Sequence, residues 1–331
     1  MASAQSPIAG ISLRSIESNG ISMRIAEAGD DGPVVLFAHG WPESWYSWRH
    51  QLIALAEAGY RAVAPDMRGY GGSDAPPDVE DYDMDHLTRD MVGILDSLGV
   101  ETATIVGHDW GAPVAQYAAL FYPERFTALA MLSVPYSGRA AGNPLAAMRQ
   151  QAGETFFYIV NHNEPDGVAE SGYDSDPRGI LSRLYLSPSS PREAPEVTDP
   201  RRIAGGWIRR LGAPKGLPAW LTEVDLDYYV AEFERAGFRG GVNYYRTFVR
   251  TWAATAGRSD FTIKVPSMFL AGEKDGIIRG AAREALSDMM APLLADLRAV
   301  TLVPEVGHWV QQEAPDETNA ALLAFLEALS D

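Results

Sequence analysis

Residues 103–119, ATIVGHDWGAPVAQYAA, are the most informative part of the sequence about the fold. It predicts a short apolar strand, a tight turn with glycines at positions 107 and 111, and a helix that begins with small residues. This order is typical of a nucleophile elbow, a sharp turn between a strand and a helix that exposes one side chain. Serine usually occupies the apex of such a turn, whereas Asp109 occupies it here. The sequence therefore predicts a carboxylate at the position of a nucleophile.

Strands and helices alternate on both sides of this turn. The expected strands are a hairpin at 11–28 with Asn19-Gly20 at its turn, then 33–40, 60–66, 102–109, 128–135, 265–275 and 298–304. The expected helices are 45–57, 83–99, 112–123, one near 281–297, and 316–329. Such alternation is typical of parallel strands joined by helices that cover both faces of a sheet. The predicted fold class is α/β, with a mostly parallel, doubly wound sheet.

The alternation stops between about residues 137 and 257. This segment is rich in Gly, Pro, Arg and aromatic residues, and it contains helical fragments such as AAMRQQAG, VAEFERAGF and NYYRTFVRTWAATA but no convincing buried strand. A chain of 331 residues has room for a core with a second piece. We therefore predict a core domain formed by 1–136 and 258–331, with a helical cap domain, 137–257, inserted into it.

Composition disfavours several classes of function. The chain has no cysteine, and its six histidines show no close pair at metal-ligand spacing, so we expect neither disulfides nor a structural metal. A formal net charge of −17 disfavours nucleic acids and anionic membranes as partners. The segment RGYGGSD (68–74) lacks the Lys-Ser/Thr pair and the full glycine spacing of a phosphate-binding loop, so we interpret it as a glycine-rich surface turn.

The sequence also bears on location and assembly. No stretch reaches the length of about 18 apolar residues that spans a bilayer. The N-terminus MASAQSPIAG (1–10) lacks the basic region and long apolar run of a secretory signal. We expect a soluble, cytoplasmic protein, and the sequence leaves monomer and homodimer open.

An aspartate at the elbow indicates a particular kind of chemistry. A carboxylate that attacks a saturated carbon forms an alkyl ester, and this ester has a carbonyl that water can attack in a second step. Serine in the same place would form an ether, which water does not readily cleave. Asp109 therefore predicts substitution at carbon, not cleavage of an ester or amide substrate.

The second step requires a base and an acid that orients it. His308 is the histidine that follows the insert, and it lies in a loop after the expected strand 298–304. The preceding strand ends in FLAGEKDGII, which offers Glu273 and Asp275. We prefer Asp275 because it stands further into the loop beyond the end of the strand.

Water attack on the ester also requires an oxyanion hole. One donor is expected to be the backbone N–H of Trp110, directly after the nucleophile, and the other the N–H of Trp41 in the turn HGWP (39–42). We also expect His39 and Pro42 of this turn to line the substrate pocket.

At these residues the sequence resembles the α/β-hydrolase-fold epoxide hydrolases. The motifs that carry the resemblance follow the family order over essentially the whole chain: HGWPESWYSWRHQ, APDMRGYGGSD, VGHDWGAPVA, AGEKD and GHWVQQEAP. By position, Asp109 matches the family's nucleophile, His308 its base and Asp275 its acid. The resemblance implies that a small-molecule epoxide and water react to give a vicinal diol, with no cofactor and no metal.

The resemblance also implies two tyrosines in the cap that hydrogen-bond and protonate the epoxide oxygen. GGVNYYR (240–246) is similar to the cap motif that carries one of them, which maps to Tyr245. The other maps to Tyr158 in ETFFYIVNHNEPDGVAE, across one inserted residue, Asp166. The chemistry is consistent with this, because the leaving alkoxide is strongly basic and a phenol in an apolar pocket can protonate it.

Two other functions compete with this one. A haloalkane dehalogenase would use the same aspartate, with the indole N–H groups of Trp41 and Trp110 holding halide. Halide needs no proton, so paired tyrosines favour an epoxide. A catalytically inactive binding protein would not need nucleophile, base, acid and oxyanion turn together.

Overall fold

The computed structural model describes residues 6–165 and 167–329. Residues 1–5, 166 and 330–331 lie outside this description. The insertion assigned to Asp166 is therefore outside the described residues, as is the first half of the N-terminal segment MASAQSPIAG.

Eight strands form one sheet in the order β1-β2-β4-β3-β5-β6-β7-β8. The pairs β1–β2 and β2–β4 are antiparallel, and the other pairs are parallel. The strands are β1 (Ser12–Ser18), β2 (Ile21–Ala28), β3 (Val34–Ala38), β4 (Arg61–Pro65), β5 (Ala103–His108), β6 (Phe126–Leu132), β7 (Ile263–Gly272) and β8 (Leu294–Val303). The predicted α/β class and mostly parallel sheet are confirmed.

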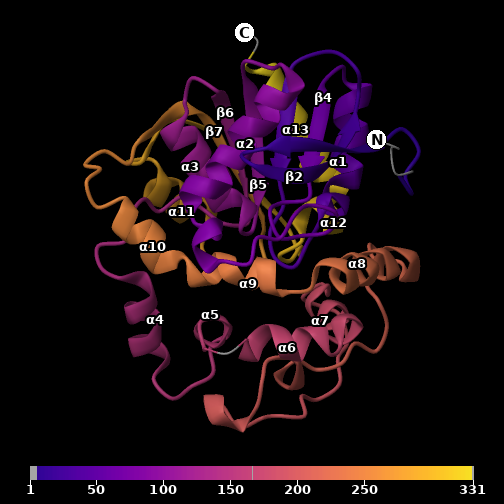
Figure 1. The fold of residues 1–331 in the computed structure, drawn as a ribbon, viewed down its shortest axis with the longest axis vertical. Helices are drawn as coiled ribbons and strands as arrows, with labels where there is room; N and C mark the ends of the chain where they lie inside the picture. The colour runs from indigo at the N-terminus through magenta and orange to yellow at the C-terminus, as the bar shows by residue number, and fades with distance from the viewer. Residues whose placement is uncertain (1–5, 166, 330–331) are drawn as a thin grey trace.

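Helices cover both faces of the sheet (Figure 1). Helices α2 and α3 pack against each other on one face, and α1 and α13 pack against each other on the opposite face. The helices outside the insert are η1 (Trp45–Trp48), α1 (Arg49–Glu57), η2 (Val79–Tyr82), α2 (Met84–Leu98), α3 (Gly111–Phe121), α11 (Arg283–Met290), α12 (Val310–Glu313) and α13 (Pro315–Glu327). The sequence placed the main ones within a few residues.

The hairpin of β1 and β2 follows from two residues. Asn19 and Gly20 have φ angles of 48° and 79°, the left-handed values that a tight two-residue hairpin turn requires. With the turn set in this way, Ser18 pairs with Ile21, and Leu13, Ile16 and Ser18 of β1 are buried. The predicted hairpin and its turn are therefore confirmed.

Between β6 and β7 the described chain consists of helices and loops. We call α4 to α10 the cap helices; in Figure 1 they gather at the lower end of the molecule, away from both termini. They are α4 (Pro144–Ala152), α5 (Tyr158–His162), α6 (Val168–Asp174), α7 (Pro177–Leu184), η3 (Arg202–Ala204), η4 (Ile208–Arg210), α8 (Glu223–Ala236), α9 (Arg239–Arg246) and α10 (Phe248–Ala254). The division into two domains at 137 and 257 stays a prediction.

Two local predictions were wrong. The helix expected near 281–297 ends at Met290, because β8 already begins at Leu294 and pairs with β7 at the edge of the sheet. The segment 68–74 is largely buried and is not a surface turn. Helix α9 covers it: the Tyr244 hydroxyl donates to the Arg68 carbonyl at 3.0 Å, and a Cβ at Gly69 would lie 2.8 Å from the Gly240 Cα.

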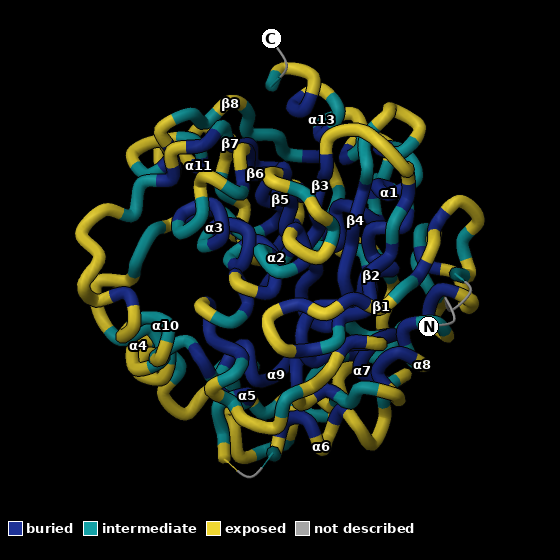
Figure 2. The backbone as a smooth tube through the Cα atoms, turned by 45° about the horizontal axis from the view of Figure 1, so that its top comes forward, coloured by how far each residue is buried: buried dark blue, intermediate teal, exposed yellow. Residues whose placement is uncertain are grey.

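The central strands form the interior of the molecule. Figure 2 shows β3, β5 and much of α9 as buried, with exposed residues concentrated in the outer loops. Within the described ranges, no helix is both long enough and apolar enough to cross a membrane.

Candidate active site

Asp109 lies at the turn between β5 and α3, followed by Trp110. Strand β5 ends at His108 and α3 begins at Gly111, and Asp109 has a φ angle of 48°. This left-handed value is uncommon for a residue other than glycine and is a mark of functional turns. The turn also needs Gly40 opposite it, because a Cβ at Gly40 would lie 2.5 Å from Asp109 Oδ1. The predicted strand, turn and helix are present, with the aspartate at the apex.

His308 and Asp275 lie beside this carboxylate. Both come from loops that follow neighbouring strands, β8 and β7. His308 Nδ1 is 3.0 Å from Asp275 Oδ2, and His308 Nε2 is 3.5 Å from Asp109 Oδ2. The rival acid, Glu273, instead forms a 3.6 Å ion pair with Lys274. The predicted trio of Asp109, His308 and Asp275 is thus brought together, with the imidazole between two carboxylates.

The two carboxylates set the charge of the imidazole. Burial disfavours the charged form of His308, but Asp275 and Asp109 outweigh burial and raise the pKa of His308 well above 6.5. Burial likewise opposes ionisation of Asp275, yet the charge and the hydrogen bond of His308 hold the pKa of this carboxyl below its ordinary value. The resting site therefore favours an imidazolium between two carboxylates.

The turn after β3 directs a backbone donor at the same carboxylate. The N–H of Trp41 donates to Asp109 Oδ1 at 2.8 Å. Trp110, which follows Asp109, is the N-cap residue of α3. The N–H of Trp41 thus lies where an oxyanion donor is needed, and the N–H of Trp110 as the second donor stays a prediction.

Two cavities meet at Asp109, Tyr158 and Tyr245. One has a volume of about 350 Å³ and extends along Trp110, Phe248 and the start of α4. The other has a volume of about 430 Å³ and extends along Trp41, Pro42, Asp275 and His308. Because both include Asp109 and the two tyrosines, the predicted nucleophile and the predicted acids line one continuous region.

The tyrosines face each other across this region. The ring centroids of Tyr158 and Tyr245 are 5.9 Å apart. Tyr245 is 3% exposed, and burial raises its pKa well above 10; burial also raises the pKa of Tyr158. Both phenols are therefore neutral at physiological pH and have a proton to donate.

One pocket prediction was wrong. Pro42 lines the second cavity, but the described walls of both cavities do not include His39. His39 is 1% exposed and its ring binds backbone: Nε2 accepts from the Met67 N–H at 2.9 Å, and Nδ1 is 2.9 Å from the Gly40 carbonyl oxygen. The His39 ring therefore stabilises the turn HGWP (39–42) through these backbone contacts.

Sequence reasoning missed a buried pair behind the trio of Asp109, His308 and Asp275. His108 Nδ1 is 2.9 Å from Glu43 Oε2, and His108 Nε2 is 2.7 Å from the carbonyl oxygen of His308. Glu43 also accepts from the Gly40 N–H at 2.7 Å and from Gln311 at 2.8 Å. A sequence signal was present, because Glu43 follows HGWP and His108 precedes the apex aspartate. The pair links the oxyanion turn to the loop that carries His308.

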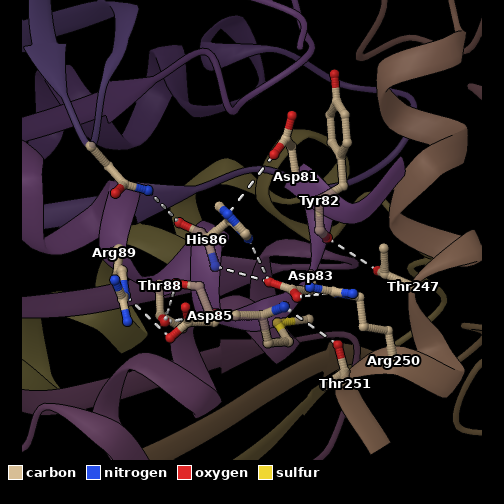
Figure 3. Close-up of polar contacts among 12 residues, drawn as sticks. Asp81, Tyr82, Asp83, Asp85, His86, Thr88, Arg89, Thr247, Arg250 and Thr251 are labelled. Carbon is tan, nitrogen blue, oxygen red and sulfur yellow. Dashed lines mark hydrogen bonds and ion pairs between the residues drawn. The ribbon is translucent and has the colours of Figure 1, made fainter. Parts of the chain in front are cut away.

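Beside the first cavity, side-chain contacts join the core to α10 (Figure 3). Asp83 accepts from Arg250 Nε at 2.6 Å, and the Met84 N–H donates to Thr251 at 3.3 Å. Met84 and Thr251 both line the cavity. Burial opposes the charge of Asp83, but hydrogen bonds from His86 and Arg250 outweigh it and lower the pKa of the carboxyl.

Across residues 6–165 and 167–329, no group of three or more His, Asp or Glu side chains is arranged to bind a metal ion. Asp109, Tyr158 and Tyr245 line both cavities, and Asp275 and His308 line the second.

Sequence comparison and structure comparison find similar proteins of the same kind. A family model described as alpha/beta hydrolase fold matches residues 33–315. Epoxide hydrolase A of Mycobacterium tuberculosis is 45% identical over 320 residues, which cover 96% of this chain and 97% of that protein. Epoxide hydrolase 1 of Siraitia grosvenorii is 42% identical over 315 residues, covering 94% and 97%. The crystal structure of Epoxide Hydrolase A from Mycobacterium thermoresistibile superposes with a TM-score of 0.86 at 44% identity, covering 96% of this chain and 98% of that chain.

Proposed function

This chain belongs to the epoxide hydrolases of the alpha/beta hydrolase fold, and we propose that it hydrolyses epoxides to vicinal diols through a covalent ester on Asp109. The observation that carries the mechanism is the convergence of one carboxylate, one imidazole and two neutral phenols on the same cavity region. The helices of residues 137–257 act as the cap, because they supply both phenols.

Ring opening is the first step. A carboxylate oxygen of Asp109 attacks an epoxide carbon, the carbon–oxygen bond of the ring breaks, and its electron pair goes to the epoxide oxygen. Tyr158 or Tyr245 gives its phenolic proton to that oxygen as the bond breaks. The products are a hydroxyalkyl ester on Asp109 and a tyrosinate. The proton that the imidazolium of His308 carries restores the phenol, which leaves a neutral imidazole.

Hydrolysis of the ester is the second step. Neutral His308, oriented by Asp275, takes a proton from water as the water oxygen attacks the ester carbonyl. The N–H of Trp41, 2.8 Å from Asp109 Oδ1 in the resting site, would stabilise the oxyanion that forms there. As the ester carbon–oxygen bond breaks, the imidazolium gives its proton to the departing alkoxide, which releases the diol. The Asp109 carboxyl formed in this step then passes its proton to His308, which restores the carboxylate and the imidazolium.

The dehalogenase alternative is less well supported. It would require the indole N–H groups of Trp41 and Trp110 to hold one halide, yet Trp41 lines one cavity and Trp110 the other. Two phenols beside the nucleophile would have no role in displacing a leaving group that needs no proton.

Intact-protein mass spectrometry tests the covalent mechanism. With styrene oxide as the substrate, Asp109→Ala is expected to lose diol formation by a factor on the order of 10⁴ or more. His308→Gln is expected to gain the mass of one whole epoxide, because the ester forms but is not hydrolysed. Glu273→Gln is the matched control for the loop after β7 and should turn over as the wild type does.

Two results would contradict the proposal. Diol formation at the wild-type rate by Asp109→Ala would exclude the ester on this residue. Halide release from 1-bromobutane, with no diol from styrene oxide, would assign the site to haloalkanes instead.

A further inference from the structure

The two tyrosines come from separate cap helices that pack against each other, and a third helix packs against both. Tyr158 begins α5 and Tyr245 lies in the last turn of α9. Helix α6 contacts both α5 and α9, and the three lie side by side in Figure 1. The distance between the phenols therefore depends on how these short helices are held against one another.

One guanidinium binds all three helices. Arg246, the residue after Tyr245, donates from Nε to the carbonyl oxygen of His162, the last residue of α5, at 3.0 Å. Its Nη1 and Nη2 donate to the two carboxylate oxygens of Glu170 in α6 at 2.8 and 2.7 Å. Nη1 also donates to Asn243 at 3.0 Å, within α9 itself. Such a bidentate pair specifies direction as well as distance.

Further contacts join the end of α5 to Tyr245. The side-chain amide of Asn163 donates both to the Ile159 carbonyl at 2.9 Å and to the Tyr245 carbonyl at 3.2 Å. The ring of His162 packs edge-on against the ring of Tyr245, with centroids 4.4 Å apart. Arg246 thus reinforces a junction that already contacts the Tyr245 ring and backbone.

The pair of Arg246 and Glu170 is shielded from solvent and separate from the reacting atoms. The two side chains are 14% and 10% exposed. In the part of the chain that the structure describes, the walls of the two cavities include neither residue. Any effect of the pair on the reaction must therefore pass through the residues that it holds.

Resting on the proposed function, we propose that Arg246, held by Glu170, is a positioning residue that keeps the Tyr245 and Tyr158 hydroxyls together at the epoxide oxygen. Both hydroxyls must reach one oxygen when the ring opens, and small displacements of reacting groups cost large factors in rate. Lysine cannot replace this arginine, because one ammonium cannot reproduce the planar fork that binds Glu170, His162 and Asn243 together.

The test separates positioning of the phenol pair from general stability. Quenched-flow mass spectrometry follows ester formation from styrene oxide in the His308→Gln protein, where the rate reports ring opening alone. Arg246→Lys is introduced into this protein and, separately, into the same protein carrying Tyr245→Phe. With both tyrosines present, we expect Arg246→Lys to slow ester formation by about tenfold. With a single phenol left there is no pair to align, so the loss should shrink to about twofold or less.

Two companion variants complete the experiment. Glu170→Gln removes the carboxylate charge and keeps Arg246, so it should slow ester formation in the same tyrosine-dependent way. If Arg246→Lys does not fold, Glu170→Gln alone serves as the test. Arg250→Lys is the matched control, since Arg250 is four residues further along the cap and binds Asp83 in the core. Its effect on ester formation should be small and the same in both backgrounds.

The outcomes are distinct. If Arg246→Lys and Glu170→Gln each slow ester formation by the same factor with and without Tyr245, the positioning role is overturned and only a structural role is left. The melting temperature reports that structural contribution separately. If no ester forms even in the parent His308→Gln protein, the proposed function fails first, and this result is distinguishable from failure of the positioning role.

Discussion

At the scale of single residues, the site couples the charge of one group to the chemistry of another. Asp275 and Asp109 both raise the pKa of His308, which favours the protonated imidazole between them. In the proposed mechanism, formation of the ester neutralises Asp109 and removes one of these two charges. The imidazole then loses its proton more easily, at the stage where a base is required.

This coupling predicts a change in the titration of His308. Asp109→Ala removes one of the neighbouring charges, so the pKa of His308 should fall relative to the wild type. NMR titration of the imidazole nitrogens measures it, and Glu273→Gln should leave the titration unchanged. An unchanged pKa in Asp109→Ala would mean that Asp275 alone sets the charge of His308.

The same shift has a consequence for stability. The unfolded pKa of a histidine is about 6.5, and the folded pKa of His308 lies above it. The stabilisation from the imidazolium is therefore fully present below pH of about 6.5 and is lost as the pH rises through the folded pKa.

At the scale of elements, Asp83 has two tasks at once. It is the N-cap of α2, where its side chain accepts from the His86 N–H, and it binds Arg250 of α10. The carboxylate thereby begins a helix of the core and also attaches a cap helix that borders the first cavity (Figure 3). The N-capping of α2 and the attachment of the cap helix α10 therefore depend on the same charge, that of the Asp83 carboxylate.

Asp83→Ala should lower the free energy of unfolding by about 1–2 kcal/mol at neutral pH, measured by urea denaturation. Because the folded pKa of Asp83 is lowered, its contribution is present above the unfolded pKa of about 3.9 and is lost as the pH falls through the folded value. The difference from the wild type should therefore shrink in acid.

The control for this prediction lies two residues away. Asp85 is exposed and forms a pair with exposed Arg89, so Asp85→Ala should change the free energy of unfolding by less than about 0.5 kcal/mol. Equal losses of unfolding free energy in Asp83→Ala and Asp85→Ala would show that burial and capping at Asp83 do not contribute to stability.

At the scale of the whole molecule, a buried charge network joins the cap helices to the core. Arg24 of β2 binds Asp66, which follows β4, at 2.5 Å, and it also binds Glu232 of α8. Nearby, the Trp45 indole donates to the hydroxyl of Tyr228, also in α8, at 2.8 Å. These contacts therefore attach the cap helix α8 firmly to the core.

Glu232→Gln should lower the free energy of unfolding by about 2 kcal/mol, because it removes the cap's charge from a buried network and leaves Arg24 with one carboxylate. Urea denaturation followed by circular dichroism measures the loss. The matched control, Glu234→Gln, changes an exposed residue of the same helix and should cost less than about 0.5 kcal/mol. A cost for Glu232→Gln as small as that of the control would mean that the network does not stabilise the fold.

Much of the fold could be predicted from the sequence, because the relevant signals are local. Alternating strands and helices, the Asn19-Gly20 turn and the glycines around Asp109 each act within a few residues. The exceptions have a physical cause. β8 at the sheet edge has mostly half-buried residues, so its pattern did not separate it from the helix before it. Helices α5 to α7 are only 5, 7 and 8 residues long, so each offers little length over which a pattern can repeat.

The sequence alone indicated the α/β class, the aspartate at the elbow and the candidate partners in the loops after the last two strands. Which groups meet became clear from the folded chain: Asp275 and not Glu273 reaches His308, His39 binds backbone, and α9 covers residues 68–74. It also brought Arg246 onto Glu170, 76 residues away in the chain. The physical reason is that such contacts are set by the packing of whole elements, which local sequence patterns do not encode.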